Sequence, residues 1–284
     1  MKRRWILSGV ALTFLACAWL LGLKPAGLFP PDAEHWSRMG EFFKAALHPA
    51  FEYQDDGVPE DADPIWIKGL KGLFLTLKFA FAAMSLAIPA ALILGFLGSS
   101  AWWPEPCGPL LKSGLRVVFY ASRFFMSLCR SIHELIWALL LLSAIGVSPL
   151  AGIVALAIPF SGTLGKVFSE LIDEESLHAA KALKSIGHHP FQTFVVGILP
   201  GALPNLITYS FYRFECALRS SAVLGFVGIE TIGLYIELSH EEFFYREVWT
   251  YFYLLLALII AVDLWSAKIR KHLNPGAESW LTAH

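Results

Sequence analysis

Six long segments of this chain are apolar enough to form membrane-spanning helices, and they limit the folds open to it. A helix needs about 20 mainly apolar residues to cross the hydrocarbon core of a bilayer. Hydrophobic residues make up 56% of the 284 residues, charged residues make up 16%, and the mean hydropathy is +0.57. This is too apolar for an ordinary soluble domain, so we predict an all-α, polytopic membrane helix bundle. The segments cover residues 5–23, 69–98, 115–145, 149–172, 199–218 and 248–267.

Charge and cysteine content exclude other classes of protein. The formal net charge of −1 excludes a generally basic nucleic-acid-binding protein. The four cysteines lie in or beside apolar segments without paired spacing. They are interpreted as small buried hydrophobic residues rather than disulfides or zinc ligands. No metal site and no cofactor is predicted.

The N-terminal region divides into an anchor and a polar insert. Residues 5–23 follow the basic start Lys2-Arg3-Arg4. A secretory signal peptide is the alternative, but the apolar run exceeds the usual core of about 7–15 residues and no small-residue cleavage site follows. We therefore expect residues 1–23 to be an N-terminal transmembrane anchor. Residues 24–68 form an insert with an acidic second half, in which residues 36–46 have the spacing of a short amphipathic helix.

Basic residues gather at alternate ends of the apolar segments. Cytoplasmic loops of membrane proteins carry an excess of Lys and Arg. This rule places both termini and the loop at residues 173–198 in the cytoplasm, and makes residues 24–68 an extracytoplasmic insert. The residues that carry the bias are Lys2, Arg3, Arg4, Lys112, Arg116, Lys181, Lys184, Lys268, Arg270 and Lys271.

The loop at residues 173–198, here called the coupling loop, has the composition of a short helix followed by a turn. Residues 176–186 are rich in Ala, Leu and Lys, which are good helix formers. Gly187 supplies the permissive backbone that ends this helix, and Pro190 suits the first turn of the next one. A short rigid helix at this place can receive a push from a soluble motor subunit.

The spacing in this loop resembles the cytoplasmic loop of importer permeases driven by ATP-binding cassettes (ABC). The family pattern is Glu-Ala-Ala, three residues, Gly, nine residues, then Ile-x-Leu-Pro. Gly187, Leu199 and Pro200 match it in register. Ala182 fills the first alanine position, whereas Lys181 replaces the Glu. The resemblance implies an ATPase-docking loop with the candidate residues Lys181, Ala182, Leu183, Lys184, Gly187, Leu199 and Pro200.

Four further segments resemble the permeases of phosphonate and phosphite importers, and they occur in the family's order. They are residues 130–139 (RSIHELIWAL, similar to R-x-I-P-E-L-V-W-A-L), 162–166 (GTLGK, similar to G-x-L-G-K), 212–215 (YRFE, similar to Y-R-W-E) and 219–228 (RSSAVLGFVG, similar to R-x-x-x-V-L-G-x-V-G). The resemblance implies a MetI-like permease architecture with its core at residues 69–272, in the bacterial cytoplasmic (inner) membrane.

The resemblance also implies a function and a set of partners. The chain would be the membrane-spanning subunit that translocates a small oxyanion, such as phosphonate, phosphite or phosphate. Its partners would be an ATP-binding cassette subunit, an extracytoplasmic substrate-binding protein, and a second copy of the chain or a sister permease, surrounded by membrane lipid. ATP hydrolysis would take place on the partner, so the chain itself would not be an enzyme.

Two partial motifs for other chemistry fail on their spacing. A nucleotide-binding loop ending at Lys166 needs Gly at position 160 and Ser or Thr at 167, where Phe160 and Val167 stand. A zinc-protease motif starting at His133 needs a second His at 137, where Trp137 stands. A self-sufficient channel or secondary transporter is the alternative function. It predicts repeats of spans, which are not seen, and it gives the coupling loop no role.

Ionisable residues inside apolar segments are costly, so they mark candidate functional sites. Arg130 and Glu134 lie one helical turn apart, and either pair with each other or line an anion path. Arg213 and Glu215 cannot face one another on a helix, so at least one needs a partner elsewhere, for example on the third segment. Arg219 lies near the outer end and is the strongest candidate to meet an incoming anion. The candidate anion path comprises Arg130, Glu134, Arg213, Arg219, Ser220 and Ser221.

Residues 224–233 resemble the family's re-entrant outer turn, which usually ends Gly-x-Gly-Gly-x-Gly. Glu230 and Thr231 stand where two of these glycines are expected. The replacements stiffen the turn and add a negative charge. Glu230 should therefore repel anions near the outer mouth.

Six spans with both termini in the cytoplasm predict opposite locations for two reporter fusions. A reporter fused after Gly57 should report an extracytoplasmic location, and one fused after Asn274 a cytoplasmic one, because the basic residues flank alternate ends of the spans. Reporter activity in whole cells measures both. If the two fusions report the same face, the number of spans is wrong by an odd number.

Overall fold

The chain forms two compact units built from helices. The computed structural model describes residues 2–22, 33–55, 57, 59, 62–100, 109–175, 178–185, 187 and 190–273. The units comprise residues 1–49 and 50–284. Every regular element in the described residues is a helix, which confirms the predicted all-α class. The boundary between the units falls inside the insert predicted at residues 24–68, and the extracytoplasmic location of that insert stays a prediction.

The first unit contains two helices. α1 (Lys2–Leu20) carries an apolar stretch, Leu7–Leu20, that is shorter than the long apolar helices of the second unit. α2 (Ala33–Leu47) confirms the helix predicted for residues 36–46. A sixth span requires α1 to cross the bilayer, and its role as an anchor stays a prediction.

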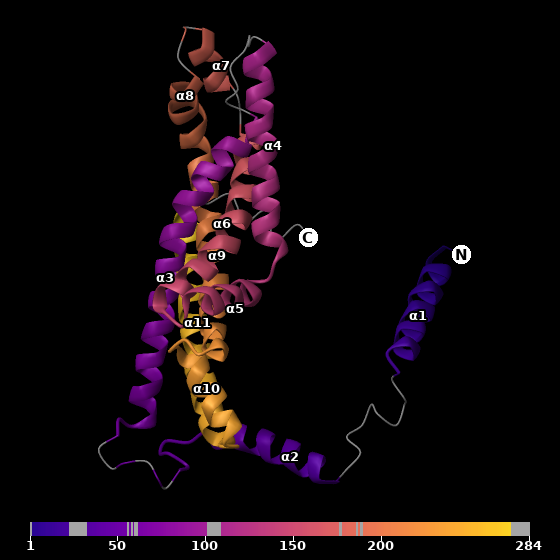
Figure 1. Ribbon diagram of the computed structural model, residues 1–284, viewed down its shortest axis with the longest axis vertical. Coiled ribbons are helices and arrows are strands. Elements are labelled where there is room, and N and C mark those ends of the chain that lie inside the picture. The colour runs from indigo at the N-terminus through magenta and orange to yellow at the C-terminus, as the bar shows by residue number, and fades with distance from the viewer. Residues whose placement is uncertain are drawn as a thin grey trace. The chain divides into compact units, whose positions relative to one another are not determined.

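In the second unit, four of the described helices are long and apolar enough to cross a membrane. One of them is a continuous helical run over Phe191–Val227, which passes through α8, a π-helical turn, α9 and a 3-10 turn. Within this unit, α7 and α8 lie at one end and α10 at the opposite end (Figure 1). The elements outside the bent pair below are α3 (Ile65–Gly98), α6 (Pro149–Glu174), α7 (His178–Ser185), α8 (Pro190–Thr193), η2 (Phe194–Ile198), α9 (Leu199–Val223), η3 (Leu224–Val227), α10 (Ile232–Glu241) and α11 (Tyr245–Leu273).

The third predicted segment, residues 115–145, is not one continuous helix. It is divided into α4 (Pro109–Ser131) and α5 (Glu134–Ile145), whose axes differ by 90°. Local bonds satisfy the backbone groups that the break exposes. The His133 side chain accepts from the N–H of Leu135, and the Trp137 indole nitrogen donates to the carbonyl of Cys129 at 3.2 Å. With the bent pair counted as one span, the described residues hold five spans.

Small residues let α3 and α6 approach each other closely. A Cβ atom added at Gly165 of α6 would lie 3.1 Å from the Leu94 Cβ, and one added at Gly95 of α3 would lie 2.8 Å from the Phe168 Cβ. Lipid chains are as apolar as leucine, so helices in a bilayer associate through such close packing rather than through the hydrophobic effect. The fully buried alanines on the α3 side are Ala80, Ala83, Ala87 and Ala91.

The turn between α9 and α10 depends on a close backbone approach. A Cβ atom added at Gly225 would lie 2.0 Å from the Leu234 nitrogen, and one added at Gly233 would lie 2.0 Å from the Ala222 oxygen. Gly228 has φ +85°, a left-handed conformation that favours glycine. These glycines therefore set the compact turn over 224–233, in which Glu230 and Thr231 are accommodated between Gly228 and Gly233.

A buried carboxylate attaches residues 50–55 to the start of α11. The Gln54 side-chain oxygen accepts from the N–H groups of Arg246 and Glu247 at 3.0 and 3.3 Å. In return, the Glu247 carboxylate accepts from the Gln54 N–H at 2.6 Å. The pair satisfies N–H groups that the first turn of a helix leaves without partners. Residues 50–55 are therefore packed onto the helical core.

Gly162 should tolerate no larger residue, because α4 packs directly over it. A Cβ atom at Gly162 would lie 2.6 Å from the Cys129 Cβ and 2.8 Å from the Met126 oxygen, whereas nothing lies within 4 Å of one at Gly114. We expect Gly162→Ala to destabilise the protein by about 1–3 kcal/mol through overpacking. Gly114→Ala, in the exposed part of α4, should be neutral or slightly stabilising because alanine favours helix. Thermal stability in detergent measures both, and equal melting temperatures for the two variants would contradict this packing.

Candidate functional site

A polar cavity of about 310 Å³ opens where α4 bends into α5. The bend supplies one side of it, and α6 and α9 supply the others. We call it the arginine cavity, because two arginines line it. Pro159 and Thr163 place it near the middle of α6. Its polar lining residues are Arg130, Ser131, His133, Glu134, Thr163, Arg213 and Ser220.

Four of the six predicted anion-path residues meet in this cavity. They are far apart in sequence, but the bend and α9 bring them together. Ser221 does not line the cavity: it is fully buried, and its hydroxyl donates to the Thr76 carbonyl at 3.0 Å and to the Leu218 carbonyl at 2.8 Å. Arg219 is exposed and also lies outside the lining. The four lining residues are Arg130, Glu134, Arg213 and Ser220.

Glu134 bonds across the cavity rather than along its own segment. Its carboxylate accepts from the Ser220 hydroxyl at 2.8 Å, which ties the first turn of α5 to α9. Among the described residues, no ion pair joins Glu134 to Arg130, because the bend ends the helix between them. The simple pairing of these two residues considered from the sequence is therefore wrong, and Arg130 is left facing the cavity.

Arg213 is positioned by aromatic rings on its own helix. Its Nε donates to the Tyr209 hydroxyl at 2.8 Å, and its guanidinium carbon lies 5.3 Å from the centre of the Tyr209 ring. Glu215 points elsewhere and pairs with Arg270 of α11, which also donates to Ser266 at 2.9 Å. The prediction that at least one of Arg213 and Glu215 has a partner elsewhere is confirmed, but for Glu215 that partner comes from α11 and not from the third segment.

The charges of the arginine cavity favour an anion. Two guanidinium groups and one carboxylate line it, which leaves a formal charge of +1 before any contribution from His133. Guanidinium groups bind carboxylate and phosphate oxygens through paired N–H donors. The hydroxyls of Thr163 and Ser220 are already used inside the protein, because they donate to the Pro159 carbonyl and to Glu134. The cavity can therefore hold a small oxyanion.

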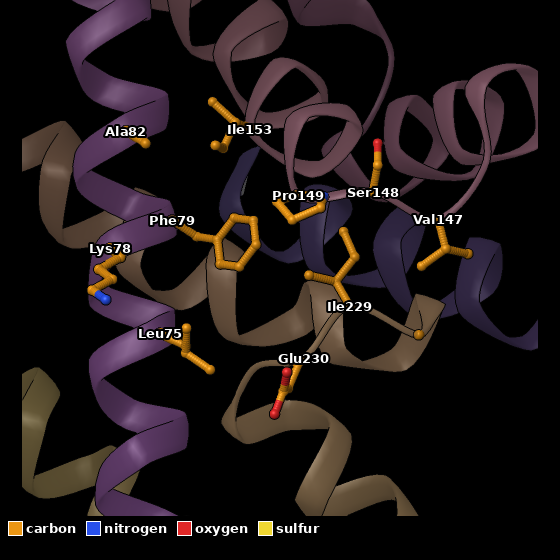
Figure 2. Close-up of a pocket in the computed structure, with 11 residues that line it drawn as sticks. Leu75, Lys78, Phe79, Ala82, Val147, Ser148, Pro149, Ile153, Ile229 and Glu230 are labelled. Carbon is orange, nitrogen blue, oxygen red and sulfur yellow. The ribbon is translucent and has the colours of Figure 1, made fainter.

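A second cavity, of about 450 Å³, has a different character. It lies between α3, the corner before α6, and the turn before α10, and most of its lining is apolar (Figure 2). The Lys78 ammonium lies 4.4 Å from the centre of the Phe74 ring, and Figure 2 shows it directed away from Phe79 and Ile229. Lys78 and Glu230 both line this cavity, so it lacks the net positive formal charge of the arginine cavity.

The coupling loop has the helix–turn–helix form predicted from its sequence. α7 carries the backbone of residues 181–184, and Gly187 follows with φ +84°. α8 then begins at Pro190, and α9 at Leu199 with Pro200 in its first turn. The sequence did not indicate the π-helical turn η2 between them, where the Leu199 N–H bonds to the Phe194 carbonyl. Ile186, His188 and His189 lie outside the described residues.

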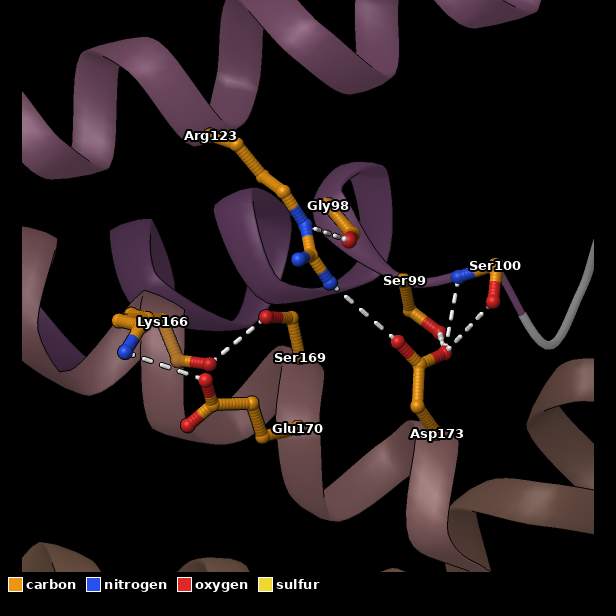
Figure 3. Close-up of polar contacts among 8 residues, drawn as sticks. All are labelled: Gly98, Ser99, Ser100, Arg123, Lys166, Ser169, Glu170 and Asp173. Atoms are coloured by element: carbon orange, nitrogen blue, oxygen red, sulfur yellow. Dashed lines mark hydrogen bonds and ion pairs between the residues drawn. The ribbon is translucent and has the colours of Figure 1, made fainter.

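The first residue of the coupling loop is tied to two other helices (Figure 3). Asp173 accepts from the Ser99 hydroxyl at 2.7 Å and from the Ser100 N–H at 2.8 Å, just beyond the end of α3. Its other oxygen lies 3.5 Å from Arg123 of α4, whose Nε donates to the Gly98 carbonyl at 3.1 Å. Movement of α6 at this residue would therefore be passed to α3 and α4.

Comparison with known proteins identifies the family. Residues 108–278 match the family described as "Binding-protein-dependent transport system inner membrane component". The chain belongs to this family. The phosphite transport system permease protein PtxC of Stutzerimonas stutzeri is 29% identical over 203 residues, which are 72% of this chain and 70% of that protein. The phosphate-import permease protein PhnE of Mycolicibacterium smegmatis is 30% identical over 69% of this chain and 35% of that protein.

Solved ABC transporter structures share the permease fold. A structure of the MetNI methionine ABC transporter in inward-facing conformations has a TM-score of 0.62 at 19% identity, and covers 75% of this chain and 99% of that chain. A crystal structure of an amino acid ABC transporter with histidines has a TM-score of 0.60 at 16% identity, covering 73% and 94%. The MetI-like architecture is confirmed. The permease is a multi-pass subunit of the inner membrane that transports rather than catalyses.

Gly187 provides a sharp test of the coupling loop. Its left-handed backbone (φ +84°) disfavours β-branched residues, whereas asparagine tolerates it, and nothing lies within 4 Å of an added Cβ atom. We expect Gly187→Val to abolish uptake by misdirecting α7, and Gly187→Asn to keep most of it. Uptake and copurification of the ATPase measure the effect, with membrane insertion as the control. Wild-type uptake and ATPase yield with Gly187→Val would rule out a docking role for this turn.

Proposed function

We propose that this permease imports an oxyanion of phosphorus, namely phosphonate, phosphite or phosphate, through the arginine cavity. The observation that carries the proposal is the meeting of Arg130 and Arg213 with only one carboxylate, beside the bend between α4 and α5. The printed names of the relatives PtxC and PhnE, a phosphite and a phosphate permease, point to the same class of substrate.

The low dielectric of the bilayer makes it costly to move the charge of an oxyanion into the helix bundle. An oxyanion loses its water on entering the helix bundle, and an uncompensated charge there costs several kcal/mol. The two guanidinium groups replace that water with charged hydrogen-bond donors. Glu134 would repel the anion, but the two arginines outnumber it, and the Ser220 hydroxyl donates to its carboxylate. The cavity therefore offers attraction on the side of Arg130 and Arg213.

The face that bears the arginine cavity needs a cover. Arg130 is exposed there, and the side chain of His133 is 63% exposed. Charged and polar groups that face lipid are unfavourable. A second copy of this chain, or a sister permease, would cover the face and enclose the cavity between two subunits.

The remaining partners act at the two ends of the helices. An ATP-binding cassette subunit would dock on the coupling loop, on residues 181–184 and around Gly187. Closure of the ATPases would move α7, and the bonds of Asp173 would pass that movement to α3 and α4. An extracytoplasmic binding protein would deliver the anion at the opposite end, near α10. In this arrangement residues 24–68 lie outside, residues 1–23 anchor the chain, and residues 69–272 form the core.

Three arginine variants test the route of the anion. We expect Arg130→Gln and Arg213→Gln each to reduce uptake at least about tenfold, since each removes a charged hydrogen bond to the anion. Arg219 is proposed as a contact at the outer mouth, outside the cavity, so Arg219→Gln should reduce uptake less. The measurement is uptake of radiolabelled phosphite, phosphate and phosphonate into vesicles that hold the complete complex.

A control distinguishes the loss of an arginine contact with the anion from the loss of the permease–ATPase complex. Copurification of the ATPase should be the same for all three variants. Uptake of a neutral or cationic solute that is indifferent to the substitutions, without uptake of any of the three oxyanions, would overturn the proposed function.

A further inference from the structure

His133 occupies the corner between α4 and α5 and has one nitrogen engaged. It is the N-cap residue of α5, with an extended backbone (φ −64°, ψ 145°). Its Nδ1 accepts from the Leu135 N–H at 3.3 Å. This bond stabilises the first turn of α5, in the way that side-chain acceptors cap helices generally.

The capping bond decides which nitrogen of the ring carries the proton. A neutral imidazole has one donor nitrogen and one acceptor nitrogen. Because Nδ1 is the acceptor, the proton lies on Nε2, and Nε2 is a hydrogen-bond donor. The helix cap therefore sets the tautomer of His133.

No hydrogen bond joins that donor nitrogen to another of the described residues. Its distance to Oε2 of Glu134 is 3.8 Å, which is too long for a hydrogen bond. Glu134 instead accepts from Ser220. His133 lines the cavity together with Arg130 and Arg213, and its side chain is 63% exposed. Enclosure of the cavity between two subunits, as proposed above, would leave this N–H in need of an acceptor inside it.

We propose that His133 donates a hydrogen bond from Nε2 to the transported oxyanion, as a third donor beside Arg130 and Arg213. The proposal rests on the proposed function. His133 would determine specificity. A fixed donor increases the affinity for a ligand that has an oxygen acceptor at that point, in addition to the charge attraction of the arginines.

Two substitutions separate the cap from the donor. His133→Ser keeps a short side-chain oxygen that can cap α5, but it places no donor at the distance of Nε2. His133→Gln keeps an amide N–H at a similar reach, but glutamine is not among the preferred N-cap residues. A residue that only stabilised the bend would respond in the opposite order from a residue that binds the anion.

The experiment measures binding and stability in the complete permease–ATPase complex in nanodiscs, without the binding protein. The probes are radiolabelled inorganic phosphate and phosphite. We expect His133→Ser to raise the Kd about tenfold at a nearly unchanged melting temperature. His133→Gln should keep the Kd within about threefold while lowering the melting temperature.

Other outcomes overturn the inference. A wild-type Kd in His133→Ser would show that Nε2 does not contact the anion. Parallel loss of binding and stability in His133→Gln, with His133→Ser unaffected in both, would show that His133 is only a cap. Import of an oxyanion by a wild-type complex that binds neither probe would show that the cavity does not hold it. If wild-type vesicles import none of the three oxyanions, the proposed function fails, and this inference fails with it.

Discussion

The hydrocarbon core of a bilayer contains no water that could bond to the backbone groups of a broken helix. The site of this permease depends on how these groups find partners at one break. At Ser131–Glu134 the chain turns by 90°, and the exposed backbone groups must find partners inside the protein. His133 caps the start of α5, and the Trp137 indole bonds to a carbonyl near the end of α4. The break that needs these bonds also turns Arg130 and Glu134 away from each other and opens the arginine cavity. The same local solution therefore supports both the fold and the site.

Close packing holds the helices together in the middle of the bundle, and polar bonds join them at its end. In the middle, alanines and glycines bring α3, α4 and α6 into contact, where lipid gives no hydrophobic drive for association. At the coupling-loop end, Asp173 joins the ends of α3 and α6 to Arg123 of α4. Three helices thus share one attachment point beside the loop. A displacement of the loop would move them as a set rather than bending one helix alone.

The limits of sequence-based prediction are clear at particular residues. The helix around residues 181–184 and the turn at Gly187 could be predicted, because helix-forming residues and a left-handed glycine are local properties. The bend at His133 could not, since no proline or glycine stands at the break and apolar stretches lie on both sides of it. The partner of Glu215 was also missed: Arg270 lies on a helix far away in sequence, and only packing brings it near. The π-helical turn at 194–198 depends in the same way on how two helices are joined.

The sequence by itself determined that this chain is an all-helical membrane protein, and it indicated the coupling loop. It also gave Arg130, Glu134, Arg213 and Ser220, together with Arg219 and Ser221, as candidates for an anion path. These follow from apolar length, charge bias and local spacing, which do not depend on the neighbours of a residue. Only the tertiary structure decided that these four residues share a cavity, that Ser221 is used inside the protein, and that Arg219 lies apart. The reason is geometric. A 90° bend and the packing of α9 change which side chains meet, and neither can be predicted from the sequence pattern alone.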